Sequence, residues 1–68
     1  MKIKYFEDTD TAIFEFTDKK IKETREVTEN IYLDLDEYEN IVNITIEHAN
    51  TNANIQEFSF QRISEESA

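Results

Sequence analysis

Residues 31–47 read IYLDLDEYENIVNITIE and contain two runs in which apolar and polar side chains alternate. The first run spans residues 31–35 and the second spans residues 42–46, and each places an apolar residue at every second position. Alternation with this period is typical of half-buried strands, and the β-branched residues in both runs favour strands over helices. The two runs therefore predict neighbouring β-strands, each with one apolar face.

The segment between the two runs, residues 36–40, is short enough to close an antiparallel hairpin. The chain contains no glycine, so we expect Asn40 to adopt the left-handed backbone conformation, which asparagine tolerates better than most residues. Pairing the two strands in this way places their apolar side chains on one face. The opposite, wetter face carries Asp34, Thr45 and Glu47.

The same alternation predicts further short strands elsewhere in the chain. These strands are Ile3–Tyr5, Ala12–Phe16 and Phe58–Phe60. Ile21–Val27 has few apolar residues and is crowded with charged ones, so we interpret it as a further, exposed edge strand. At most one short helical turn is expected near residues 49–56, and residues 64–68 are expected to form a frayed tail. The sequence therefore predicts a single domain over residues 1–68, mainly β (or β-rich α+β), with a small antiparallel sheet of about five to six short strands.

The chain has 68 residues, of which only 38% are hydrophobic, and it contains no cysteine. A domain of this length buries only about 60% of the surface that its unfolded chain exposes, so its stability is marginal. Without cysteine, the chain has neither disulfides nor the usual cysteine-based zinc sites. With little helix to cover its apolar face, the sheet must fold onto itself or meet a second copy. We therefore expect a homodimer.

The net charge is −9, from 16 acidic and 7 basic residues. Nucleic acid and anionic membranes are disfavoured as direct ligands, because binding to them needs clustered Lys and Arg. A small basic protein would be attracted to this surface, whereas the plainer interpretation is that the charge only keeps the protein soluble. Residues 1–5 lack the apolar stretch of a signal peptide, and no apolar run reaches the ~20 residues of a membrane helix. We therefore expect a cytoplasmic protein without a membrane partner.

A cluster of carboxylates in the predicted hairpin turn is the main candidate for metal chemistry. It consists of Asp34, Asp36, Glu37 and Glu39, and strand alternation places Asp34 and Asp36 on one face, which suits a hard cation such as calcium or magnesium. The calcium-loop template does not fit, because its glycine position falls on Glu39 and its twelfth position on Thr45. The competing interpretation is a solvated acidic turn without a metal.

No other pattern points to catalysis or to a cofactor. His48 is the only histidine, and we interpret it as a turn or edge residue because the sequence offers no nucleophile to pair with it. Phosphate-binding loops need glycine, which the chain lacks. We therefore expect a protein that is not an enzyme and that has no cofactor. A divalent-cation binder and an acidic mimic of nucleic acid remain the alternatives to an interaction module.

The aromatic residues fall into two groups. Phe14, Phe16, Phe58 and Phe60 follow the apolar pattern and predict a core or a dimer interface. Phe6, Tyr32 and Tyr38 fall outside that pattern, and aromatic side chains are enriched at protein interfaces. These three residues are therefore the candidate contacts to a partner.

The alternating runs also resemble a known family of short prokaryotic proteins. The resemblance covers roughly residues 1–50 and is carried by Met1–Tyr5, by Asp10–Phe16 with Asp18, by Ile31–Glu37 and by Asn40–Ile46. The family is the domain of unknown function number twenty-two eighty-three. Its members usually have glycine at three places, which here hold Asn30, Glu39 and Asn43, and they often have aspartate where this chain has Phe6.

The resemblance implies a small β-rich bacterial protein without known enzymatic activity and gives no catalytic residues. Some members are encoded beside small basic toxins of the ribosome-dependent nuclease type and are suspected antitoxins. The charge of −9 is compatible with neutralising such a partner. Our expectation is an acidic, non-enzymatic protein-interaction module, antitoxin-like toward a small basic protein.

Overall fold

The hairpin predicted from residues 31–47 is the centre of the sheet in the computed structural model, which describes residues 1–64. Strand β4 (Ile31–Leu35) pairs antiparallel with β5 (Ile41–Glu47). Leu33 lies opposite Ile44, and Asp34 lies opposite Asn43. The pairing confirms that the apolar side chains share one face and that Asp34, Thr45 and Glu47 share the other.

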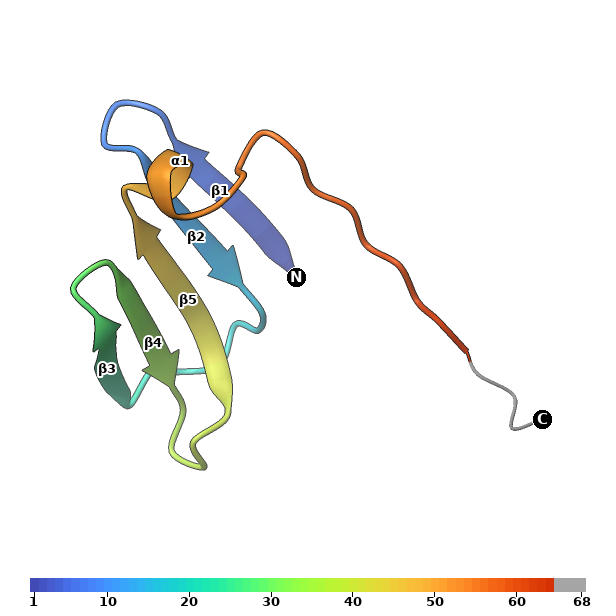
Figure 1. The fold of residues 1–68 in the computed structure, drawn as a ribbon. Coiled ribbons are helices and arrows are strands. Elements are labelled where there is room, and N and C mark those ends of the chain that lie inside the picture. The colour runs from blue at the N-terminus through green and yellow to red at the C-terminus, as the bar shows by residue number, and fades with distance from the viewer. Residues whose placement is uncertain (65–68) are drawn as a thin grey trace.

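Three further strands complete the sheet, and Figure 1 shows their arrangement. They are β1 (Lys2–Phe6), β2 (Thr11–Glu15) and β3 (Glu23–Thr28). The spatial order is β1-β2-β5-β4-β3, and every pair is antiparallel. The segment after β2 crosses the end of the sheet to start β3 at the far edge. The predicted edge strand over Ile21–Val27 is thus confirmed as β3, which starts two residues later than expected.

The predicted helical turn is also present, as helix α1 (Ala49–Asn52), and it is tied to the β1–β2 turn by Asp10. The Asp10 carbonyl accepts the Ala49 N–H at 2.9 Å, and its Oδ1 accepts the Asn50 N–H at 3.1 Å. The Tyr5 hydroxyl donates to the same Oδ1 at 2.6 Å and accepts from Asn50 Nδ2 at 2.7 Å. Donating to this carboxylate raises the pKa of the Tyr5 phenol. The observed mixture of five strands and one short helix confirms a mainly β fold.

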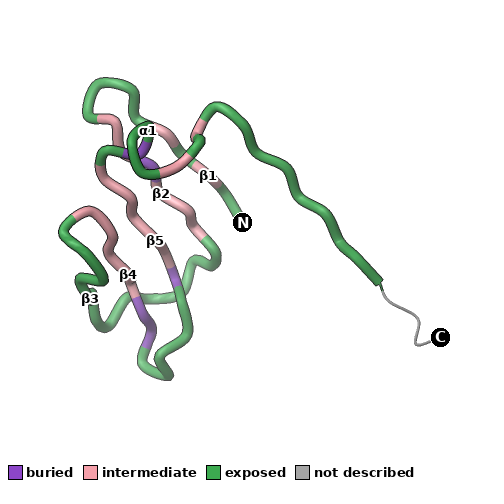
Figure 2. Tube along the Cα trace, in the orientation of Figure 1, coloured by how far each residue is buried: buried purple, intermediate pink, exposed green. Residues whose placement is uncertain are grey.

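Few side chains are buried in this fold. The buried hydrophobic residues are Ala12, Leu35, Val42 and Ala49, and Figure 2 shows them in short stretches near the ends of the sheet. Leu35 and Val42 lie where the β4–β5 register shifts after Asp34. The larger apolar side chains in the middle of the strands stay half-buried. The described chain is therefore a single layer without a deep core.

The expected strand at Phe58–Phe60 is wrong. This segment is extended, but it is not assigned to a strand, and within residues 1–64 no backbone hydrogen bond joins it to the sheet. Alternation shows that a segment can present an apolar face, but a strand also needs a neighbour to pair its backbone groups. The expected frayed tail over residues 64–68 lies, apart from Ser64, outside the described residues. Within residues 1–64, no helix has the length and apolarity needed to cross a membrane.

The β4–β5 turn corrects the expectation for Asn40, because the left-handed residue is Glu39, with φ of 65°. The buried Asp36 carboxylate accepts the N–H groups of Tyr38 at 2.8 Å and Asn40 at 2.9 Å. The Asp36 N–H in turn donates to the Asn40 carbonyl at 3.0 Å. Asn40 is therefore held opposite Asp36 at the base of the turn, and the reversal falls on the residue before it. The N–H of Asn40 and that of Tyr38 lower the pKa of Asp36.

Glu39→Gly is expected to raise the melting temperature by about 3 °C, because a side chain at positive φ is strained and glycine is not. Glu37→Gly is the matched control, because Glu37 is not among the residues with positive φ and should lose stability. Thermal unfolding followed by circular dichroism gives both values. Equal losses in the two variants would contradict strain at Glu39.

Asp36→Asn is expected to lower the melting temperature at pH 7 by about 5 °C, because a charged acceptor of two N–H groups is lost. The folded-state pKa of Asp36 is below its ordinary value of 3.8, so the carboxylate stabilises the fold above that pH. Its contribution disappears as the pH falls through the folded-state pKa. The difference in melting temperature between Asp36→Asn and wild type should therefore shrink below pH 3.8. Glu37→Gln is the control, because it removes an equal charge from the exposed neighbouring residue and should have the melting temperature of wild type.

Candidate functional site

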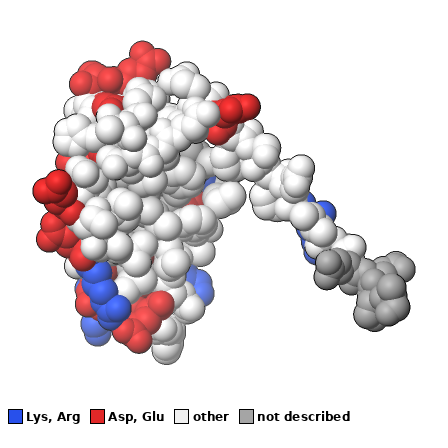
Figure 3. Space-filling model, in the orientation of Figure 1, with Lys and Arg blue, Asp and Glu red and all other residues white. Residues whose placement is uncertain are grey.

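One face of the sheet carries almost only apolar side chains. By strand register this apolar face consists of Ile3, Tyr5, Ala12, Phe14, Ile31, Leu33, Ile44 and Ile46. Of these, Ala12 is fully buried, and the other seven are half-buried. Within residues 1–64, the only element besides the strands is α1, which contacts the end of β5, so no second layer lies across this face. Figure 3 shows few charged atoms on the side of the sheet that faces the viewer, while red atoms gather along its rim.

Ion pairs border the apolar face at the β3 edge. Arg25 lies opposite Leu33 in the register. Its guanidinium binds Glu23 Oε2 at 2.9 Å and Glu39 Oε1 at 2.6 Å, so it links β3 to the β4–β5 turn. The pairing with Glu23 and Glu39 raises the pKa of Arg25. All three side chains are exposed, and such surface pairs stabilise a fold only weakly, so they act chiefly as a polar rim beside the apolar face.

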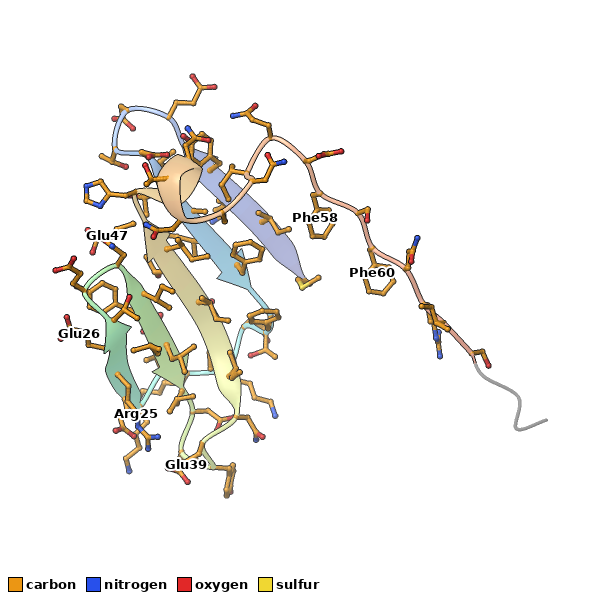
Figure 4. All side chains as sticks on the ribbon, viewed as in Figure 1. Arg25, Glu26, Glu39, Glu47, Phe58 and Phe60 are labelled. Carbon is orange, nitrogen blue, oxygen red and sulfur yellow. The ribbon has the colours of Figure 1, made fainter. Side chains whose placement is uncertain are left out.

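The opposite face is polar and is organised around Tyr32. In the register, Tyr32 lies between Thr45 of β5 and Glu26 of β3. Burial raises the pKa of the Tyr32 phenol, and the carboxylates of Glu47 and Glu26 raise it further. Figure 4 shows Glu26 and Glu47 along the same side of the molecule. A half-buried aromatic ring is thus surrounded by negative charge.

Other carboxylates on this polar face are held by hydrogen bonds or by an ion pair. Asp34 accepts from Thr24 Oγ1 at 2.6 Å and from Asn43 Nδ2 at 3.2 Å. The Lys4 ammonium lies 3.0 Å from Glu15 Oε2. Threonine, asparagine and lysine side chains interrupt the acidic residues, so the face does not present the continuous row of carboxylates that a mimic of nucleic acid would need.

The structure does not assemble Asp34, Asp36, Glu37 and Glu39 into one site. Asp34 projects from the polar face, whereas Asp36 lies beyond the end of β4 with its carboxylate bound to backbone N–H groups of the turn. Glu39 is paired with Arg25, and Glu37 is exposed. Within residues 1–64, there is no group of three or more His, Cys, Asp or Glu side chains arranged to hold a metal ion.

The candidate partner contacts are also divided. Phe6 and Tyr32 point to the polar face, whereas Tyr38 lies in the β4–β5 turn at the far end of the sheet and is 76% exposed. His48 lies in the bend between β5 and α1, where its Nδ1 is 3.0 Å from Asn30 Oδ1. This position agrees with the interpretation of His48 as a turn residue.

Sequence reasoning missed a cavity of mixed charge between the segment that joins β2 to β3 and the β4–β5 turn. This open cavity of about 640 Å³ is lined by Lys19, Lys20, Ile21 and Lys22 on one side and by Asp36, Glu37 and Tyr38 on the other. The signal was the run KKIK at residues 19–22, but the sequence alone did not show that this segment meets the β4–β5 turn. All three lysines are exposed.

Comparison with known proteins gives a family but no activity. A search of curated proteins and a search of solved structures both found no match. A family model described as "Protein of unknown function (DUF2283)" matches residues 2–50, which contain all five strands of the sheet. Because this match covers most of the chain and agrees with the resemblance seen in the strand pattern, the protein belongs to the DUF2283 family.

Proposed function

We propose that this protein is a non-enzymatic interaction module of the cytoplasm that forms a homodimer through its apolar face and binds a small basic protein with its acidic surface. The apolar face carries the proposal, because seven of its eight side chains remain half-buried without a covering layer. A sheet with one apolar face is stable only when another layer covers it.

The exposed area indicates how much surface a second copy would cover. The chain exposes 5786 Å², whereas a compact monomer of 68 residues is expected to expose about 4,500 Å². A standard interface removes about 800 Å² from each partner. The segment that extends away from the sheet after α1 accounts for part of this surplus, and the half-buried apolar face adds to it. Each Å² of apolar surface that a second copy covers would contribute roughly 25 cal/mol.

A second copy suits this face because the face has almost no charge. Two chains that each carry a charge of −9 repel one another wherever acidic surfaces meet. Contact through the apolar faces keeps the acidic residues at the rim and on the outside. The two sheets would then form a sandwich with an interior about 10 Å thick, which is the usual spacing of packed sheets.

The outer surface of such a dimer supports the second part of the proposal. It would present the polar face of each sheet, with Tyr32 beside Glu26 and Glu47. Negative potential of this kind attracts a basic protein and speeds association at low ionic strength. The suspected antitoxin role of some relatives agrees with a small basic protein as the partner.

Multi-angle light scattering at micromolar concentration is expected to give the mass of a dimer. Ile44→Thr removes apolar surface from the proposed interface and should raise the dimer dissociation constant at least about tenfold. Ile13→Thr is the matched control, because Ile13 lies opposite Thr45 on the polar face and should leave the constant nearly unchanged. Circular dichroism establishes that both variants are folded. A folded, strictly monomeric wild-type protein would overturn the proposal.

Co-expression with the product of an adjacent basic reading frame is expected to give a complex that is retained at low salt and weakens as salt is added. The double substitution Glu26→Gln and Glu47→Gln should reduce the retained fraction several-fold, because it removes charge around Tyr32. Glu7→Gln with Asp8→Gln removes equal charge from the β1–β2 turn and serves as the control. If both double substitutions weaken the complex equally, the contact lies elsewhere on the protein. If no complex forms at low salt, this basic protein is not the partner.

A further inference from the structure

The segment Asn54–Ile63, here called the C-terminal arm, extends away from the sheet after α1. Phe58 is 61% exposed, Phe60 is 72% exposed and Ile63 is 78% exposed. Figure 4 shows the Phe58 and Phe60 rings on the same side of the arm. The arm therefore has an apolar side, and within residues 1–64 no backbone hydrogen bond joins it to a strand.

The arm projects away from its own sheet, and the hydrogen bonds at its base are local. The Ile55 N–H donates to the Ala53 carbonyl at 3.1 Å, and Asn54 Nδ2 donates to Glu57 Oε2 at 3.1 Å. The radius of gyration is 14.2 Å, whereas a compact domain of this length has about 11 Å. In this outward position the arm is accessible to another molecule.

The free edge of β1 matches the arm. On β1, Ile3 and Tyr5 point to the apolar face, while Lys2 and Lys4 point to the polar face. A strand added along this edge would place Phe58 and Phe60 beside the two apolar residues. Glu57, Ser59 and Gln61 would then lie on the side of the two lysines, so that acidic and basic charge meet.

The other free edge of the sheet does not suit the arm. Strand β3 is exposed along its whole length and carries Glu23, Arg25 and Glu26. Its register with β4 shifts between Glu26 and Thr28, which interrupts the regular spacing of its backbone groups. Charge and irregularity of this kind protect an edge strand from pairing with another chain.

We propose that the C-terminal arm of each chain pairs as a sixth strand, antiparallel, with β1 of a second copy of this chain. This inference rests on the homodimer proposed above and adds the segment that fastens the two copies. Backbone pairing supplies affinity and the Phe58 and Phe60 side chains supply specificity, as in other cases where an extended segment joins a sheet edge. Reciprocal exchange of two arms gives a closed, two-fold dimer.

The first test removes the apolar side of the arm and leaves the sheet intact. The double substitution Phe58→Ser and Phe60→Ser should raise the dimer dissociation constant at least about 30-fold. Gln61→Ala, on the other side of the arm, is the control and should change it less than about threefold. An unchanged constant in the Phe58 and Phe60 variant overturns the arm contact and leaves the dimer through the apolar face intact.

The second test uses the absence of native cysteine. A Ser59→Cys chain is mixed with a Lys2→Cys chain or with a Lys4→Cys chain. Ser59 would face Lys4 in one pairing register of the arm with β1, and Lys2 in the register shifted by two residues. Mild oxidation should join most of the mixed chains into a covalent dimer, because adjacent strands bring Cβ atoms within disulfide reach. Glu26→Cys, on the same face at the β3 edge, is the control and should give only background cross-linking.

The outcomes separate the two proposals. Rapid formation of an intrachain disulfide in a chain with both Lys4→Cys and Ser59→Cys, without cross-linking between mixed single variants, would show that the arm folds back on its own β1 and overturns the exchange. A dimer by light scattering without cross-linking in either design overturns the arm contact alone. A full-length chain that stays monomeric overturns both this inference and the proposed homodimer.

Discussion

The need to cover an apolar sheet face governs this molecule. In the row formed by Phe14, Ile44 and Leu33, each side chain is half-buried, because the strands give it neighbours on both sides while no other element of residues 1–64 covers it. The buried hydrophobic residues lie instead near the ends of the sheet, where α1 contacts β5 and where the segment between β2 and β3 hydrogen-bonds to the carbonyls of Val42 and Leu35. A single layer gains little from its own apolar residues, so covering this face contributes to the stability of the fold as well as to association.

A chain without glycine must make its turns with residues that have side chains. Asp10, Glu39 and His48 all have positive φ, and each is accompanied by hydrogen bonds that offset the strain. Asp10 binds Tyr5 and the start of α1, and His48 binds Asn30, which lies in the turn just before the adjacent strand β4. Two of these strained residues thus hold α1 at the end of the sheet, and α1 in turn sets the point from which the C-terminal arm leaves.

The sequence was informative where one physical rule acted alone. Alternation predicted four of the five strands, because a half-buried strand needs an apolar residue at every second position, whereas β3 was predicted from its charged residues as an exposed edge strand. The same rule was wrong at Phe58–Phe60, since it describes a side-chain pattern and not the presence of a neighbouring strand. Alternation also placed Asp34 and Asp36 on one face. Because the register shifts at the end of β4, only Asp34 lies on the polar face, whereas the Asp36 carboxylate binds backbone N–H groups of the turn. The lysine-lined cavity depends on a contact between distant segments, which no local pattern records.

Assembly would stop at a pair of chains if the exchange of arms is reciprocal, and the difference between the two edges of the sheet favours this. If both edges were regular and apolar, arms and edges could continue to join and produce a fibre. Here β3 is charged and irregular, and only β1 offers a regular edge with apolar residues on one side. Each chain then has one arm to give and one edge to receive it, so a reciprocal exchange uses both. In the proposed dimer the acidic residues would remain outside the pair, where their charges would add together and present a stronger field to a basic protein than one chain could.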